Sequence, residues 1–371
     1  MKKLVFITDS GFWSHSTDIL SSLNKKYNLL VIVTFIEGFL NHNKDDIYSY
    51  CKLNNISVII VDKGNFRFRN PINIITSYQK YIKTIKNYNA DYIYIESFGN
   101  PYLAIMYYIF FNTKKIIIGV HDFKLHPLGD KKTKLSARIY KYLYTRLYHN
   151  FHFFSESQKN LFIKKYPFKK AFVARLFKLD IKYKEKNVDK NLAAKTFLYF
   201  GRILHYKGVD ILIKAANILR DKGIDFKLII AGSCDAFESY KNLLKENVNI
   251  ETRIYRIPKE ELNELFISSG FFVAPYREVT QSGPLIISYN YQTIPIASNL
   301  NGFKEYIINN KTGFLFKNES PESLATCMEK ALLLNNNDKN KIYKNIKIFT
   351  KKEFDIDIVS QKYQNFFNEI S

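Results

Sequence analysis

The chain has 371 residues, of which 46% are hydrophobic and 24% charged, and its formal net charge is +22. This length suffices for two ordinary domains with their own cores. The three cysteines, Cys51, Cys234 and Cys327, lie far apart without C-x-x-C or Cys/His spacing, which argues against a structural zinc site or a secreted disulfide framework and favours a reducing cytoplasm.

The positive charge is concentrated in the N-terminal half. Residues 1–180 carry 28 Lys and Arg against 12 Asp and Glu, a net charge of +16, whereas residues 181–371 carry 28 against 22, a net charge of +6. Such a field attracts phosphate-bearing partners: nucleic acid, anionic lipid or a diphosphate-linked substrate. The frequent Lys, Asn, Ile and Tyr allow a second interpretation, in which a compositional bias makes lysine the default surface residue.

The N-terminal segment MKKLVFITDS predicts a buried strand, because Asp9 interrupts the apolar run before a signal-peptide core could form. No stretch reaches the roughly 18 apolar residues of a membrane span. The closest, residues 102–111, is followed by Asn112 and Lys114. We therefore expect a cytoplasmic protein, either soluble or peripheral on the inner face of the cytoplasmic membrane.

Short β-branched runs alternate with helical patterns along the whole chain. Strands are predicted in LVFIT, LLVIVTF, SVIIV, DYIYIES, KIIIGVHD and FHFFSES, and again in TFLYFGR, FKLIIAG, ETRIYRI, FFVAPY, IPIASN and GFLF. Helices are predicted between them, for example over residues 209–221 and 260–269. This alternation is typical of parallel βαβ units. It predicts an α/β fold of two Rossmann-like, doubly wound domains that face each other across a cleft, with ligands at the loops after the strands.

A charged segment without apolar periodicity, residues 180–195, separates the two series of strands. We accordingly predict domains over residues 1–185 and 186–350. Helical spacing of apolar residues from 343 to 370 predicts a terminal helix, and residues 351–371 are expected to pack back towards the N-terminal domain.

Two loops of the second domain carry the features of an anion site. In FGRILHYKGVD, Gly201 permits close backbone approach, and Arg202 and Lys207 precede a helix that begins near Val209. A planar guanidinium, a point charge and a helix N-terminus together suit an anionic ligand. The second loop follows the strand FFVAPY, and its polar residues open a helix near Pro284; they are Arg277, Glu278, Thr280, Gln281, Ser282 and Gly283.

These motifs resemble the family-4 retaining glycosyltransferases of the GT-B fold, over most of the chain. The GR...KG...L..A signature matches Gly201, Arg202, Lys207, Gly208, Leu212 and Ala215, and the P-Y-x-x-x-T-Q-S-G loop looks like that of a subgroup. The resemblance implies an acceptor domain followed by a nucleotide-sugar domain. It also implies that Arg202 and Lys207 hold the donor diphosphate, that Gly201, Gln281, Ser282 and Gly283 contact it, and that Thr280 lies where an acidic residue often contacts the sugar.

We call the loop of residues 277–283, which follows the strand FFVAPY, the donor loop. It departs from the commoner family pattern, in which seven residues separate two glutamates. In that register stand Thr280 and Ser288. Ser288 would make only a weaker ribose contact, and Glu278, two residues out of register, is expected to reach the same pocket. By resemblance, the backbone at Arg256 and Ile257 reads the nucleobase, without distinguishing uracil from guanine.

The loop GVHDFKLHPLGD, residues 119–130, follows a strand of the first domain and resembles the same subgroup. The resemblance makes His121 the contact to the transferred sugar, with Asp122 and His126 on the acceptor side. The alternative is a histidine that is merely hydrogen-bonded at a strand end. A metal site from these three residues is conceivable by residue type, but the fold normally neutralises the leaving diphosphate with Arg, Lys and helix ends, so no metal or other cofactor is expected.

Two further strand-end loops complete the predicted acceptor side. DSGFWSHS places Gly11, Trp13 and His15 after the first strand, and Trp13 either stacks on a sugar or packs over the sheet edge. IESFGNP offers Ser97 and Asn100.

Residues 131–150 predict a basic, aromatic helix with one stripe of apolar residues; the stripe comprises Leu135, Ile139, Leu143 and Leu147. Such a helix either lies on an anionic membrane surface or buries its leucines in the domain.

The resemblance implies transfer of a hexose from a UDP-sugar or GDP-sugar to a glycan or a polyprenyl-diphosphate-linked acceptor, in bacterial surface polysaccharide synthesis such as lipopolysaccharide O-antigen or capsule. A GT-B nucleotide-sugar epimerase and a non-catalytic sugar-binding protein remain alternatives. Charge alone suggests a nucleic-acid-binding protein; because no nucleic-acid module is visible, no nucleic-acid partner is predicted.

Overall fold

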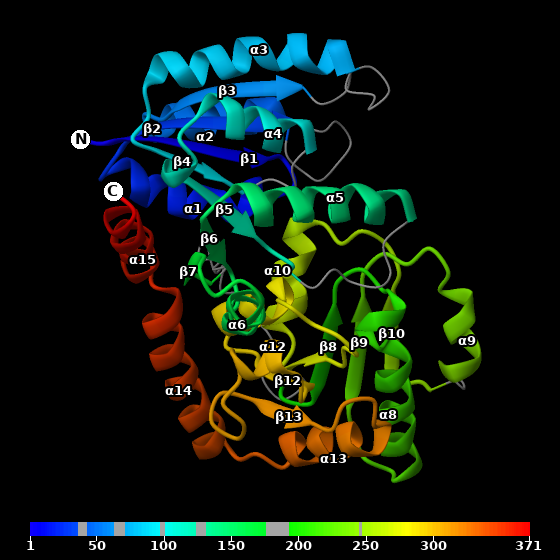
Figure 1. Cartoon of the computed structure of the whole chain (residues 1–371). Helices are drawn as coiled ribbons and strands as arrows, with labels where there is room; N and C mark the ends of the chain where they lie inside the picture. The colour runs from blue at the N-terminus through cyan, green and yellow to red at the C-terminus, as the bar shows by residue number, and fades with distance from the viewer. Residues whose placement is uncertain (36–42, 63–70, 97–100, 124–130, 176–192, 245–246) are drawn as a thin grey trace. The chain divides into compact units, whose positions relative to one another are not determined.

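The structure, a computed structural model, describes residues 1–35, 43–62, 71–96, 101–123, 131–175, 193–244 and 247–371. The chain divides into two compact units (Figure 1). One comprises Met1–Leu176 and Phe354–Ser371, and the other comprises Phe177–Glu353. Most of the charged segment predicted to link the domains lies outside the described residues.

Seven parallel strands form the sheet of the first unit, in the order β3-β2-β1-β4-β5-β6-β7. Their bounds are β1 Lys3–Asp9, β2 Asn28–Phe35, β3 Ser57–Asp62, β4 Tyr92–Ile95, β5 Ile116–Val120, β6 Asn150–Phe153 and β7 Lys170–Val173. The strand order reverses between β1 and β4, and doubly wound folds bind ligands at such a point, outside the carboxyl ends of the strands.

Helices cover both faces of this sheet, which explains why its strands are nearly continuous apolar runs. One face carries α3 (Pro71–Tyr88), α4 (Pro101–Phe110), α5 (Lys131–Leu147) and α6 (Glu156–Lys165). A 3-10 turn, η1 (Thr113–Lys115), leads from α4 into β5. The other face carries α1 (Trp13–Asn24), α2 (Lys44–Leu53) and α15 (Ile356–Glu369).

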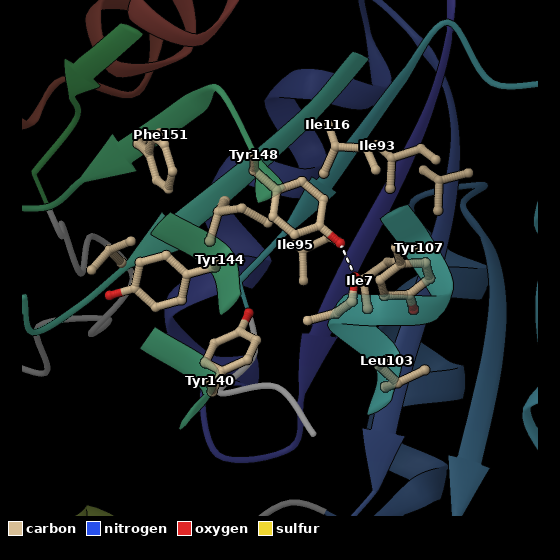
Figure 2. Packing of buried hydrophobic residues seen from close by; sticks show 14 of the residues in the cluster. Ile7, Ile93, Ile95, Leu103, Tyr107, Ile116, Tyr140, Tyr144, Tyr148 and Phe151 are labelled. Atoms are coloured by element: carbon tan, nitrogen blue, oxygen red, sulfur yellow. Dashed lines mark hydrogen bonds between the residues drawn. The ribbon is translucent and has the colours of Figure 1, made fainter. Parts of the chain in front are cut away.

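The helix α5 buries one face in the core of the first unit (Figure 2). Tyr140, Tyr144 and Tyr148 recur every fourth residue and are all buried among the apolar side chains of α4 and the sheet. The Tyr148 hydroxyl donates to the Ala104 carbonyl at 2.5 Å, so its polar end is satisfied. Burial of each such ring contributes on the order of 2 kcal/mol.

Two of the four residues of the predicted apolar stripe pack against this core. Leu143 and Leu147 pack against the core cluster, while Ile139 is exposed; the side chain of Leu135 lies outside the described set. Leu143 and Leu147 are thus buried in the domain rather than facing a membrane, as the second interpretation of the stripe predicts.

The C-terminal segment forms two helices where the sequence predicts one. The helix α14 (Asn336–Phe354) ends before Asp355, whose extended backbone and side chain cap α15 by accepting from the N–H groups of Asp357 and Ile358. An Asp at this position competes for backbone N–H groups and starts a new helix. The rings of α15 then pack on the first sheet; Phe367, for example, stacks on Tyr92 with centroids 5.0 Å apart.

Six parallel strands form the sheet of the second unit, in the order β10-β9-β8-β11-β12-β13. They are β8 Thr196–Phe200, β9 Lys227–Ala231, β10 Ile250–Arg253, β11 Phe271–Ala274, β12 Ile294–Ser298 and β13 Phe314–Phe316. The helices are η2 His205–Lys207, α8 Val209–Asp221, α9 Glu238–Leu244, α10 Lys259–Ile267, α11 Gly283–Asn290, α12 Asn301–Lys304, α13 Pro321–Leu332 and most of α14. The order reverses between β8 and β11, which places the ligand-binding edge there.

Candidate active site

Glycines shape the loops at the carboxyl edge of the second sheet. Gly201 and Gly232 follow β8 and β9 with φ of +129° and +149°, and a β-carbon on Gly232 would stand 2.1 Å from the Gly201 carbonyl oxygen. The two loops cross at backbone distance, which a side chain would prevent. After this crossing, the loop that follows β8 continues into η2.

Gly208 joins η2 to α8 under a stricter constraint. Its φ is +66°, and a β-carbon there would lie 2.0 Å from the Pro275 carbonyl oxygen. Gly208 therefore fixes the start of α8 directly against the end of β11.

We expect Gly208→Ala to lower the melting temperature of the protein markedly, because a left-handed backbone strain of about 1–2 kcal/mol adds to this backbone clash. Gly223→Ala is the matched control: Gly223 has a similar φ of +70°, but no described atom lies within 4 Å of its β-carbon position. Equal melting temperatures for the two variants, measured by thermal unfolding, would contradict the close approach at Gly208.

The ammonium of Lys207 lies at the centre of this edge. Its Nζ is 3.2 Å from the place of a β-carbon on Gly201, and Pro284 Cγ lies 3.8 Å from the same place. Nζ also stands 5.2 Å from the centroid of the Tyr276 ring, and burial lowers the pKa of Lys207. The structure thus brings the loop after β8 and the first turn of α11 to one point, with a cation between them.

The first turn of α11 is built as an open helix end. Ser282 caps it, its hydroxyl accepting from the Leu285 N–H at 3.4 Å, and Pro284 occupies the first turn. No described atom comes within 4 Å of a β-carbon position on Gly283. Because a helix N-terminus carries unsatisfied N–H groups and partial positive charge, this opening beside Lys207 suits a phosphate group.

Arg202 stands at the outer side of the same loop. Its side chain is exposed and donates from Nη2 to Asp235 Oδ2 at 2.9 Å. An exposed pair of this kind is worth little by itself, so an anionic ligand could draw the guanidinium away from Asp235.

Arg277 fastens the donor loop, a role that the sequence pattern does not reveal. Its two terminal nitrogens donate to Asp210 at 2.9 and 2.7 Å, and its backbone N–H donates to the Tyr206 carbonyl at 2.7 Å. Burial by itself would raise the pKa of Asp210, but the hydrogen bonds and charge of Arg277 lower it overall. This bidentate pair ties the loop after β11 to the start of α8.

The remaining predicted donor residues are placed differently. Thr280 and Gln281 are partly buried in the loop, and Glu278 is exposed. Arg256 is exposed and Ile257 half-buried, between β10 and α10.

The placement of Ser288 does not support the predicted ribose contact. Its side chain is 0% exposed, and its hydroxyl donates to the Leu285 carbonyl at 2.6 Å. The register of the family motif falls inside α11 at this point, and the helix turns the hydroxyl into its own backbone.

In the first unit, the strand ends beside the reversal of strand order hold a buried polar cluster. Glu96 follows β4 and is 4% exposed. It accepts hydrogen bonds from Ser16 Oγ at 2.5 Å and Thr8 Oγ1 at 2.9 Å, and its second oxygen lies 3.8 Å from His121 Nε2. We name Glu96, His121, Ser16 and Thr8 the Glu96 cluster.

Aromatic rings hold the imidazole of His121 on both sides. Phe12 and Phe154 stack on it with centroids 4.0 and 4.1 Å away. Burial raises the pKa of Glu96 to about 7, although the hydrogen bonds from Ser16 and Thr8 oppose the rise. A carboxyl that titrates near neutral pH beside a clamped imidazole can hold or release a proton at the strand ends.

Other predicted acceptor residues lie around this cluster. The N–H groups of Gly11 and Phe12 donate to Asp9 Oδ1 at 2.8 and 3.2 Å, forming the turn after β1, and Asp122 is half-buried. Trp13 is 2% exposed and packs edge-on against Tyr50, so of the two interpretations the structure supports packing rather than stacking on a sugar. The His15 side chain and the residues Ser97, Asn100 and His126 lie outside the described set.

Among the described residues, no three acidic, histidine or cysteine side chains gather as a metal site, and no described helix has the length and apolar character of a membrane span.

The chain is similar in sequence to known glycosyltransferases. Residues 180–349 match the family of glycosyl transferases group 1. Over 155 residues the chain is 30% identical to an uncharacterized glycosyltransferase of Haemophilus influenzae, covering 41% of this chain and 42% of the relative. Over 209 residues it is 25% identical to the glycogen synthase of Thermodesulfovibrio yellowstonii, covering 53% and 41%. The chain thus spans about two fifths of these curated relatives.

Solved structures match nearly the whole chain. The crystal structure of Anabaena HepE in complex with UDP superposes with a TM-score of 0.72 at 16% identity, covering 99% of this chain and 100% of that one. A glycosyltransferase of Rickettsia africae gives a TM-score of 0.72 at 18% identity, covering 100% and 98%. The chain has the GT-B fold, as predicted. The match to the glycosyl transferases group 1 covers residues 180–349, which contain the second sheet.

Proposed function

We propose that the chain is a glycosyltransferase that takes a hexose from a nucleotide-diphosphate sugar and retains its anomeric configuration. The observation that carries the proposal is the position of Lys207 beside the open N-terminus of α11. A diphosphate there would meet an ammonium, backbone N–H groups and, within reach, the guanidinium of Arg202. HepE structures are known with UDP and with UDP-glucose, which supports a UDP-sugar as donor; a GDP-sugar is the other candidate.

In the proposed reaction the bond between the anomeric carbon and the phosphate oxygen breaks, and its electron pair leaves with the nucleoside diphosphate. The oxygen of an acceptor hydroxyl forms the new bond to the anomeric carbon, and its proton passes to the phosphate oxygen that has left that carbon. Lys207, Arg202 and the N–H groups at Ser282 and Gly283 stabilise the negative charge that grows on the leaving diphosphate. Charge placed in advance where it develops is generally the largest catalytic contribution of such sites.

On the acceptor side we propose that His121 contacts the transferred sugar. Glu96 and the two flanking rings would then act as positioning groups, because they fix the plane of the imidazole and place a carboxylate near its Nε2. The sequence motif predicts His121 as the sugar contact but does not reveal Glu96 or the two rings around it.

The proposed acceptor is a glycan or a polyprenyl-diphosphate-linked oligosaccharide, in the assembly of a bacterial surface polysaccharide such as an O-antigen or capsule. The excess of basic residues in the N-terminal half supports an acceptor that carries phosphate. A lipid-linked acceptor would bring the protein to the inner face of the cytoplasmic membrane.

Incubation with a nucleotide sugar, with and without a lipid-linked oligosaccharide fraction, tests the proposal. We expect release of nucleoside diphosphate and a lengthened glycan only when the acceptor is present. Conversion of the sugar to an isomer without acceptor would support an epimerase instead. Tight donor binding without either product would support a non-catalytic sugar-binding protein.

A further inference from the structure

The helix α4 presents an apolar surface to solvent. Five large side chains of this ten-residue helix are between 36% and 65% exposed; they are Tyr102, Ile105, Tyr108, Ile109 and Phe110. The opposite side of the helix, with Leu103 and Tyr107, packs into the core (Figure 2). The sequence of α4 contains no charged residue, so its outer side lacks the polar residues typical of a solvent-facing helix.

Exposed apolar side chains also lie on the neighbouring helix. The helix α5 lies beside α4 (Figure 1), and its outer residues Ile139 and Tyr142 are also exposed. We call these two residues and the five exposed residues of α4 the α4 face. A clustered patch of this kind marks an interaction surface more often than a scattered exposed residue does.

Basic residues surround the α4 face. Exposed lysines and arginines lie on α3, on η1 and on α5; they are Lys83, Lys86, Lys114, Lys115, Arg138 and Arg146. Lys86 Nζ stands 4.3 Å from the centroid of the Phe110 ring, and the Arg146 guanidinium 5.4 Å from that of Tyr142. Neither α3, α4, η1 nor α5 contains a single Asp or Glu.

We infer that the α4 face docks the protein on an anionic lipid surface. Aromatic and branched side chains would enter the region between headgroups and acyl chains, and the surrounding ammonium and guanidinium groups would meet lipid phosphates. A helix of ten residues is about 15 Å long, half the thickness of the hydrocarbon core, so it lies on the membrane rather than across it.

A second copy of the chain is a poorer occupant of this face. Two copies meeting through it would bring together the basic residues of α3, η1 and α5 from both copies, and the sequences of these helices contain no Asp or Glu to pair with them. Like charges facing each other across an interface cost several kcal/mol and select against such a partner. An anionic bilayer instead complements both the apolar centre and the basic rim.

This inference deepens the proposed membrane location, and it moves the contact from the leucine stripe of α5 to the outer side of α4. In relation to the proposed transferase activity, a protein held by the α4 face would take a lipid-linked acceptor from the surface to which it is bound.

Sedimentation with vesicles tests the inference. We expect the wild-type protein to sediment with vesicles of phosphatidylglycerol and phosphatidylcholine at about 0.15 M salt, and to sediment far less with phosphatidylcholine alone. The double variant Ile105→Ser/Ile109→Ser should bind anionic vesicles at least tenfold more weakly, and so should Lys114→Glu/Lys115→Glu. Leu53→Ser, on an exposed leucine of α2, is the matched control and should bind as the wild type does.

Equal vesicle binding by the wild type and both double variants, or no binding by the wild type, would overturn the inference. Dimers in gel filtration that the isoleucine variant abolishes, without vesicle binding, would assign the face to a second copy. Circular dichroism and a melting temperature equal to that of the wild type establish that the first unit of each variant is folded, and nucleoside diphosphate binding establishes the same for the second unit. Variants that bind nucleotide but not vesicles support the inference, and a wild type that binds vesicles but no nucleotide would overturn the proposed function alone.

Discussion

Replacing Lys207 with Ala is expected to lower turnover by about 10²–10³-fold, the usual cost of removing one group that stabilises developing negative charge. Lys207 Nζ is held beside Gly201 and the first turn of α11, and burial already lowers its pKa. A diphosphate would restore a partner to this ammonium. The rate of nucleoside diphosphate release at saturating donor measures the effect.

Arg202→Ala should give a smaller but still severe loss, because this side chain is exposed and must leave Asp235 to reach the ligand. Arg220→Ala is the matched control, since Arg220 pairs with Asp221 at the C-terminal end of α8, outside the loops of the proposed diphosphate site. Near-normal turnover in both the Lys207 and Arg202 variants would remove the diphosphate site from this edge of the sheet.

Glu96→Gln is expected to change how both activity and stability depend on pH. The native pKa of Glu96 is raised from 4.5 to about 7, so the folded state binds a proton that the unfolded chain releases. The stabilising contribution is complete below pH 4.5 and is lost as the pH rises through about 7. A rise of this size corresponds to about 3 kcal/mol.

Melting temperatures at pH 5 and pH 8 measure this effect. The wild type should lose stability relative to Glu96→Gln between the two values, because glutamine does not titrate. His152 is buried with its pKa lowered to about 3, but it is present in both proteins and cancels in the comparison. The turnover profile of the variant should also lack the inflection near pH 7. Parallel stability curves would contradict a buried, proton-binding Glu96.

The architecture follows from local patterns in the sequence. Twelve predicted strands correspond to strands of the two sheets, because buried parallel strands read as short β-branched runs. The strand β7 escapes prediction because its sequence, KAFV, offers only three apolar residues, of which Val173 alone is β-branched. The break at Asp355 escapes because the apolar spacing of α14 and α15 continues across it.

The site is only partly readable in the same way. The glycines and basic residues of the motifs can be predicted from the sequence, because each acts through its own backbone or charge next to a strand end. Pairings across the fold do not: Glu96 with His121, and Arg277 with Asp210, join segments that are 25 and 67 residues apart. Whether a side chain such as Trp13 or Ser288 lies at the surface or in the core depends on packing between distant segments. No local sequence pattern contains that information.

The most direct test of the central claim is a thermal-shift titration of the purified protein with UDP, GDP, ADP and CMP. A nucleoside diphosphate that binds only the native state, present at a free concentration of about 100 times its Kd, raises the free energy of unfolding by about 2.7 kcal/mol. We predict a clear, saturable rise in melting temperature with one nucleoside diphosphate, UDP or GDP, and a much weaker rise in Lys207→Ala. No rise with any of the nucleotides would contradict a nucleotide-sugar site at the edge formed by β8 and β11.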